Sequence, residues 1–355
     1  MNHEPSAQNR QMFQPATAFW RHYHPETAPY AFHANSAEQA RSWQEKTRLA
    51  LGTRLGFVND PPVEAGAEEL MTADKGDYLR TRMVMQTAPD TAMPFYLLTP
   101  KECEPPYPVV LALAGHGYGV SDIVGLWEDG SERDTPDGYH RDFAVALCRQ
   151  GFAVVAPEIS CFGDRRTDFG YLDQTMGQQA PTTCEHTAAL ALHHGGSVVG
   201  LRVRDGLRLV DYLQTRADLD IGRLGCMGIS GGGMHTLFST CMDTRITAAV
   251  VSGYFSTFRD SILAMHHCPC NFVHGLSAFG EMADLAGLVA PRPLFVESGN
   301  HDPIFPREAV EHGLVDARKV YSVFGAQERL EHGFFEGRHR IDGTAAYQFL
   351  RAHLA

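Results

Sequence analysis

The pattern of hydrophobic and polar positions changes close to residue 108. Beyond it, short runs that are apolar throughout alternate with stretches of helical periodicity. Strands buried on both faces have this fully apolar pattern, and their alternation with helices predicts a mostly parallel central sheet flanked by helices, an α/β fold. The runs that we expect to form strands are 109–114, 152–156, 224–227, 247–251, 294–296 and the less purely apolar 330–335. The stretches that we expect to form helices include 142–149, 201–213 and 344–353.

The segments before residue 108 have different periods. Residues 36–56 carry apolar positions at helical spacing, with a serine before the first turn and a glycine at the end, so they predict a helix. Residues 77–99 alternate around a turn at Pro89, which predicts paired strands. The expected organisation is an N-terminal helical extension over 1–75 and a catalytic α/β domain over 76–355, with excursions at 158–198 and 253–290.

Composition and charge narrow the class of protein. The chain has 355 residues, with 30 basic against 42 acidic side chains and a formal net charge of −12. This balance argues against nucleic acid or an anionic membrane as a partner. No apolar run reaches the ~18 residues of a membrane span, and the first residues lack the apolar core of a secretory signal. We therefore expect a cytoplasmic protein, and the sequence leaves open whether it forms a homo-oligomer.

Cysteine usage gives one candidate metal site. The eight cysteines are ordinary usage for a chain of this length, which fits reduced thiols better than a disulfide framework. The suggestive cluster is His266-His267-Cys268-Pro269-Cys270. A zinc site needs a second ligand pair at a suitable spacing, and none is evident in the sequence. We therefore expect a structural loop there, and neither a metal nor a cofactor.

One serine lies inside a run of glycines just after the expected strand 224–227. The stretch Gly228-Ile229-Ser230-Gly231-Gly232 has the G-x-S-x-G spacing of a nucleophile elbow, in which small neighbours relieve the crowding of a strained serine. A helix-like run follows, so the N–H of Gly231 is expected at a helix N-terminus, where it can stabilise an oxyanion. We therefore predict Ser230 as a nucleophile and Gly231 as an oxyanion donor.

A carboxylate and a histidine follow two later strands. Asp302 comes after 294–296 and can accept a hydrogen bond from a histidine ring; Glu297 is the rival acid, but it still lies in the strand. His339 lies beyond the last strand, after a glycine turn, whereas His332 is expected within that strand. Because ligands bind at the carboxyl ends of parallel strands, we predict a catalytic triad of Ser230, Asp302 and His339.

These motifs resemble those of a known family. The chain is similar, over roughly residues 75–355, to α/β-hydrolases of the dienelactone hydrolase and acetyl (xylan) esterase branch. The stretches that carry the resemblance are His116-Gly-Tyr, the segment 200–213, Gly-Ile-Ser-Gly-Gly, Ala290-Pro-Arg-Pro-Leu and Phe335-Glu-Gly-Arg-His. His116-Gly-Tyr resembles the oxyanion loop of cephalosporin-C deacetylases and acetyl xylan esterases, which implies that the N–H of Tyr118 is the second oxyanion donor. The chain has Gly231 where those enzymes carry glutamine, and a serine where dienelactone hydrolases proper use a cysteine.

The two excursions are expected to shape the substrate pocket. We predict that His116, Phe162 and Tyr254 contact the substrate. Arg165 and Arg166 follow Phe162 closely and have two interpretations: they bind a substrate carboxylate, or they form plain ion pairs, with Asp164 adjacent.

Together these features predict a serine hydrolase that cleaves carboxylic esters of small molecules through an acyl-enzyme, with His339 as the general base. The resemblance alone implies acetylated carbohydrates as the first substrates to test. Two alternatives remain open at this stage. One is an acyltransferase that uses the same triad, and the other is a non-catalytic binding module on a hydrolase scaffold.

Overall fold

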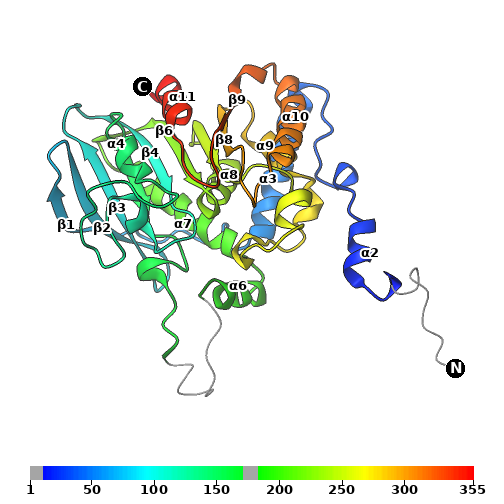
Figure 1. Ribbon diagram of the computed structural model, residues 1–355, viewed down its shortest axis with the longest axis horizontal. Coiled ribbons are helices and arrows are strands. Elements are labelled where there is room, and N and C mark those ends of the chain that lie inside the picture. Colours follow the sequence, from blue (N-terminus) through cyan, green and yellow to red (C-terminus); the bar gives the residue numbers. More distant parts are fainter. Residues whose placement is uncertain (1–10, 171–182) are drawn as a thin grey trace.

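The computed structural model describes residues 11–170 and 183–355. Within these ranges nine strands form one sheet, in the order β1-β2-β3-β5-β4-β6-β7-β8-β9 (Figure 1). The strands are β1 (Glu68–Asp74), β2 (Tyr78–Ala88), β3 (Thr91–Pro100), β4 (Tyr107–Leu113), β5 (Ala153–Pro157), β6 (Leu219–Ile229), β7 (Ala248–Ser252), β8 (Leu294–Gly299) and β9 (Leu330–Phe335).

The sheet has an antiparallel end and a parallel body. β1, β2 and β3 pair antiparallel with one another, and β3 also pairs antiparallel with β5. From β5 through β4, β6, β7 and β8 to β9, all neighbours are parallel. The predicted mostly parallel sheet is therefore confirmed. Because the parallel strands end at the same edge, the segments that follow β4, β6, β8 and β9 come together there.

Helices cover both faces of the sheet, as the apolar strands require. α4 and α11 pack on one face, and α3, α7, α8, α9 and α10 pack on the other. Figure 1 shows α6 and α2 outside this layered body. The helices are α2 (Pro15–Arg21), α3 (Ala37–Leu55), α4 (Phe143–Cys148), α6 (Thr183–His193), α7 (Val198–Leu213), α8 (Gly231–Met242), α9 (Met282–Val289), α10 (Arg307–Val323) and α11 (Thr344–Leu354).

The N-terminal region packs into the core of the fold and does not form a separate extension. The predicted helix over 36–56 is α3, whose first turn is capped by the Ser36 hydroxyl, which accepts a hydrogen bond from the N–H of Gln39 at 3.2 Å. Leu51 and Leu55 of α3 are fully buried in the same core cluster as residues of α8 and α9. The expected extension over 1–75 also contains β1, which forms an edge of the sheet by pairing with β2.

No helix in the described ranges is long and apolar enough to span a membrane. Part of the expected excursion 158–198, residues 171–182, lies outside the described residues.

Candidate active site

Ser230 sits at the turn between β6 and α8 in a conformation that side chains rarely adopt. Its φ is 57° and its ψ is −122°, a geometry that costs about 1–3 kcal/mol and persists only where the surroundings impose it. Flanking glycines make the turn possible, because a Cβ at Gly228 would collide with the carbonyl oxygen of Gly232, and one at Gly232 with that of Leu113. Gly231 is the first residue of α8, so its N–H has no acceptor within the helix and points out of the helix N-terminus.

A buried carboxylate in the loop after β8 contacts a histidine in the loop after β9. Asp302 Oδ2 lies 2.6 Å from Nδ1 of His339, and the Asp302 side chain is only 1% exposed. Asp302 Oδ1 accepts hydrogen bonds from the N–H groups of Ile304 and Phe305, which hold the carboxylate in place. The other ring nitrogen of His339, Nε2, is buried and has no hydrogen-bond partner among the described residues. The histidine is therefore oriented by the acid, with Nε2 available to another group.

The position of the His339 ring depends on Gly253, the residue after β7. Gly253 has a φ of +49°, and a Cβ there would lie 2.9 Å from Cε1 of His339. A larger residue would push the ring away from the sheet edge. This glycine was not among the predicted site residues, because nothing in the neighbouring sequence indicates which side chain it faces.

Glu297, the rival acid, has a different position. It lies in β8 and accepts hydrogen bonds from the N–H groups of Asp342 and Gly343 and from the Ser252 hydroxyl, at 2.8–3.1 Å. Its side chain is buried, and this burial raises the pKa of the carboxyl group. Glu297 therefore anchors the segment that follows His339, rather than contacting the His339 ring.

His332 and His339 should respond differently to removal. His332 lies within β9, opposite Val296 of β8, and its Nδ1 is 3.0 Å from a guanidinium nitrogen of Arg318. We expect His339→Ala to lower the rate at which a fluorophosphonate probe labels Ser230 by about 10²–10⁴-fold, the usual contribution of a general base.

His332→Ala is the matched control and should label at close to the wild-type rate. Probe-labelling rates of the two purified variants measure this difference. A slow His332→Ala beside a fast His339→Ala would reverse the assignment of the base.

The serine and the histidine face one small cavity. Its volume is about 290 Å³, at the small end of the range for small-ligand pockets. The residues lining it are His116, Tyr139, Ser230, Gly231, His266, His267, Cys268, Asn271, Ile304, Phe305 and His339. Burial, together with the neighbouring histidines, lowers the pKa of His267, which favours the neutral ring. The cavity therefore combines an apolar wall with imidazole and hydroxyl groups.

The loop after β4 approaches the serine from the other side. His116 lines the cavity, and a Cβ at Gly231 would lie 3.1 Å from its Nδ1. Tyr118 directs its side chain elsewhere: its hydroxyl donates to the carbonyl oxygen of Leu126 at 3.0 Å and contacts Arg133. A role for Tyr118 in the site would have to come from its backbone N–H, and this stays a prediction.

Two residues that the sequence analysis missed support this loop. The hydroxyl of Tyr139 donates to the carbonyl oxygen of His116 at 2.6 Å, and its ring lies 5.4 Å from that of His339. Burial raises the pKa of Tyr139, so the hydroxyl remains a donor. Nε2 of His140 accepts a hydrogen bond from the N–H of Gly115 at 2.9 Å. Both residues lie in an irregular segment with no motif that would have identified them.

The other predicted pocket residues lie behind the wall of the cavity. Phe162 packs edge-on against His116, with ring centroids 5.3 Å apart, and Tyr254 is 1% exposed and packs against Phe305. The ion-pair interpretation holds for both arginines, but with other partners than Asp164. Arg165 contacts Asp205 at 2.7 Å and Arg166 contacts Glu128 at 2.8 Å.

Four potential metal ligands meet beside the cavity that Ser230 and His339 face. One ligand atom each of His116, Cys184, Cys268 and Cys270 lies within 4.8 Å of the others. They come from the loop after β4, from α6 and from the loop 268–270. No metal site was expected, because the sequence has no second ligand pair near Cys268, but in the fold Cys184 and His116 approach Cys268 and Cys270 from distant segments.

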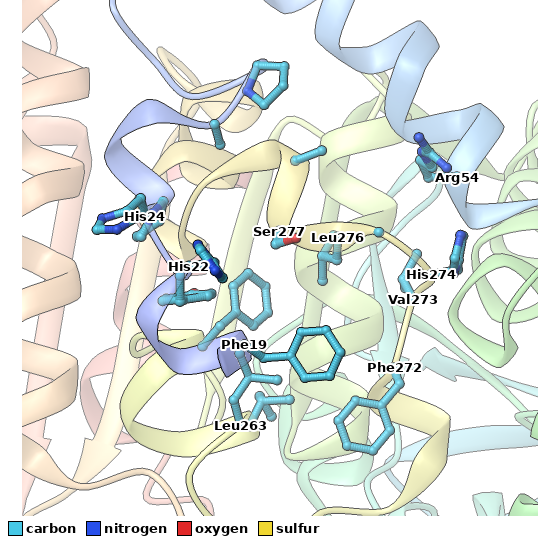
Figure 2. A pocket seen from close by; sticks show the side chains of 18 of the residues that line it. Phe19, His22, His24, Arg54, Leu263, Phe272, Val273, His274, Leu276 and Ser277 are labelled. Atoms are coloured by element: carbon cyan, nitrogen blue, oxygen red, sulfur yellow. The ribbon is translucent and has the colours of Figure 1, made fainter. Parts of the chain in front are cut away.

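A larger cavity, of about 760 Å³, lies next to the one that Ser230 and His339 face, between α2 and the segment 258–278 (Figure 2). Asn271 lines both cavities. Figure 2 shows the Phe19 side chain of α2 beside Leu263 and Phe272. All three side chains are substantially exposed, at 44–76%. Neither Ser230 nor His339 lines this cavity, so the predicted nucleophile belongs to the smaller of the two cavities.

Comparison with known proteins gives one family and a consistent set of structures. A family model described as "Abhydrolase family" matches residues 21–306. A putative hydrolase, YtaP, of Bacillus subtilis (strain 168) is 28% identical over 257 residues, which cover 68% of this chain and 78% of that protein.

Among solved structures, the fold is similar to that of a putative acetyl xylan esterase from Bacteroides fragilis. The TM-score is 0.73 at 17% identity, with 91% of this chain and 82% of that chain covered. It is also similar to a glucuronoyl esterase from Solibacter usitatus, with a TM-score of 0.65 at 16% identity, covering 94% and 100% of the two chains. At these identities the likeness establishes the fold.

Proposed function

Because the chain belongs to the abhydrolase family, we propose that it is a serine esterase that cleaves carboxylic esters of small molecules through an acyl-enzyme. The observation that carries the proposal is the contact between Asp302 and His339 at 2.6 Å, with His339 and the strained Ser230 facing the same cavity. A buried acid, a histidine oriented by it and a serine on an elbow are the parts that acyl transfer requires.

In the proposed mechanism, His339 accepts the proton of the Ser230 hydroxyl as the serine oxygen attacks the ester carbonyl. Asp302 holds the ring in the tautomer that leaves Nε2 free to accept that proton, and it stabilises the imidazolium that forms. The N–H groups of Gly231 and Tyr118 donate to the oxyanion of the tetrahedral intermediate. His339 then protonates the leaving alcohol, and in the second half it activates the water that releases the acid.

For the substrate, we propose esters of carbohydrates, with acetyl esters first. Two kinds of support favour this class. The proteins of similar fold described above are a putative acetyl xylan esterase and a glucuronoyl esterase. The cavity around Ser230 is also small, with Ile304 and Phe305 as an apolar wall that suits a short acyl group. The alcohol part of the substrate would extend past Asn271, where the larger cavity begins.

A panel of esters tests this proposal. Acetylated xylo-oligosaccharides, a glucuronate methyl ester and a series of nitrophenyl esters of increasing acyl length should be compared by kcat/KM. We expect the acetyl esters to exceed the long-chain esters, because the cavity around Ser230 leaves little room for a long acyl chain. A preference for long chains would contradict the substrate class.

The same assays separate the two alternative functions. If an added alcohol captured most of the acyl group, the enzyme would be an acyltransferase. If no ester were cleaved and Ser230 remained unlabelled, it would be a binding module.

A further inference from the structure

The four-residue cluster beside the catalytic cavity has the composition of a zinc site. Three cysteines and one histidine form one of the usual ligand sets of structural zinc, which is bound tetrahedrally with Zn–S distances of about 2.3 Å and Zn–N distances of about 2.0–2.1 Å. Such a tetrahedron has ligand–ligand edges of roughly 3.5–3.8 Å. Cys270 Sγ already lies 3.3 Å from Nε2 of His116, and all four ligand atoms lie within 4.8 Å of one another. A small contraction would complete the coordination.

A buried positive charge near the cluster is a second, independent observation that favours a zinc site. Arg202 of α7 is 1% exposed and lies over the ring of Phe162, which packs with Cys161, Cys184 and Cys270. Its Nη2 donates to the carbonyl oxygen of Ser160 at 3.3 Å, but its Nε and Nη1 have no hydrogen-bond partner in the described part of the chain. A buried guanidinium without an anionic partner is strongly destabilising. Neutral thiols do not supply that negative charge.

We propose that His116, Cys184, Cys268 and Cys270 bind one zinc ion in a closed structural site. Binding releases the three thiol protons, so that three thiolates and one neutral imidazole surround the Zn²⁺ ion. The complex then carries a net charge of −1, which Arg202 balances. All four positions of the tetrahedron are filled by the protein, so the metal has no open position for a water molecule or a substrate, and the ester chemistry stays with Ser230.

The zinc ion would hold together three segments, two of which line the cavity that Ser230 and His339 face. His116 belongs to the loop after β4, Cys184 to α6, and Cys268 and Cys270 to the loop that also carries Asn271. Coordination through Nε2 would leave Nδ1 of His116 facing Gly231 and fix the turn that contains the N–H of Tyr118. The ion would thus act as a positioning element for the oxyanion loop, without contact with the reacting atoms.

Metal analysis of the intact protein tests this proposal. The full chain should be purified without a metal-binding tag, and zinc measured by mass spectrometry of the elements. The chelated protein should then be titrated with zinc alone, and in a separate sample with cobalt. We expect one zinc ion per chain, and thiolate-to-cobalt charge-transfer bands in the near ultraviolet with the visible bands of tetrahedral cobalt. Protein that contains no zinc and binds neither metal would overturn the proposal, and so would a disulfide between Cys184 and Cys268 in the freshly purified protein.

The ligand set is tested by substitution. Cys184→Ser and Cys270→Ser should each lose the stoichiometric zinc, whereas Cys161→Ser should retain it. Cys161 is the matched control because it is buried beside Cys184 and lies outside the four ligands. Loss of zinc in Cys161→Ser, or its retention in both ligand variants, would overturn the assignment.

Cobalt spectra of the wild-type protein remain informative even if a ligand variant fails to fold. Ser230→Ala should bind zinc fully, so failure of the zinc site and failure of the esterase proposal can be distinguished.

Discussion

Replacing Ser230 with alanine is expected to lower kcat for ester hydrolysis by roughly 10⁵–10⁶-fold, to a level that oxyanion stabilisation and binding alone can sustain. The physical reason is that alanine lacks the hydroxyl that attacks the ester carbonyl in the proposed mechanism. The variant should fold, because alanine keeps the Cβ atom that the elbow already accommodates. Ester hydrolysis and labelling by a fluorophosphonate probe, followed by peptide mapping, measure the effect.

Ser239→Ala is the matched control for this experiment. Ser239 lies in the same helix, α8, and its buried hydroxyl has no hydrogen-bond partner among the described residues, so its removal should cost little. We expect the wild-type protein and Ser239→Ala to carry the label on the peptide that contains Ser230. A label on another residue, or full activity in Ser230→Ala, would contradict the proposed nucleophile.

Asp302→Asn is expected to lower kcat by about 10⁴-fold with the fold intact. Asparagine can still accept the N–H groups of Ile304 and Phe305 through its oxygen. Its amide nitrogen then takes the place of Oδ2 and donates to Nδ1 of His339, which puts the ring proton on Nε2 and blocks its action as a base. Steady-state kinetics on an acetyl ester and a thermal unfolding curve separate the catalytic effect from a loss of stability.

Glu297→Gln tests the rival acid. Because Glu297 contacts backbone N–H groups after His339 and not the ring, we expect this variant to retain most of its kcat and to lose stability instead. A nearly silent Asp302→Asn beside an inactive Glu297→Gln would show that the acid is Glu297.

Much of the architecture could be predicted from the sequence because its causes are local. Each fully apolar run became a strand of the parallel body, with bounds that differ by a few residues, and β6 begins at Leu219, before the predicted 224. Helix α3 follows its serine cap and its glycine end. The contact between Asp302 and His339 was also predictable, because both residues follow parallel strands and such strands end at one edge of the sheet.

The remaining features depend on contacts between segments far apart in the chain. The role of Gly253 becomes visible only where the ring of His339, 86 positions later, packs against it. Tyr139 and His140 act on the β4 loop from an irregular segment, and Cys184 reaches Cys268 from α6. Periodicity and motifs contain no information on such pairs, because a single sequence does not indicate which loops meet.

The proposed acid and base follow two directly paired strands, and the proposed nucleophile follows a third strand that pairs with neither. β8 and β9 are paired along their whole length, and Glu297 of β8 is hydrogen-bonded to the backbone just beyond His339. Ser230 follows β6, and β7 lies between β6 and β8 in the sheet. A sliding movement of β6 relative to β8 would therefore change the distance between Ser230 and His339 and leave the contact between His339 and Asp302 intact. Because Nε2 of His339 has no hydrogen-bond partner among the described residues, we expect Ser230 to stay protonated in the free protein. Ser230 should then react slowly with weak electrophiles, until a bound ester brings the serine and the histidine together.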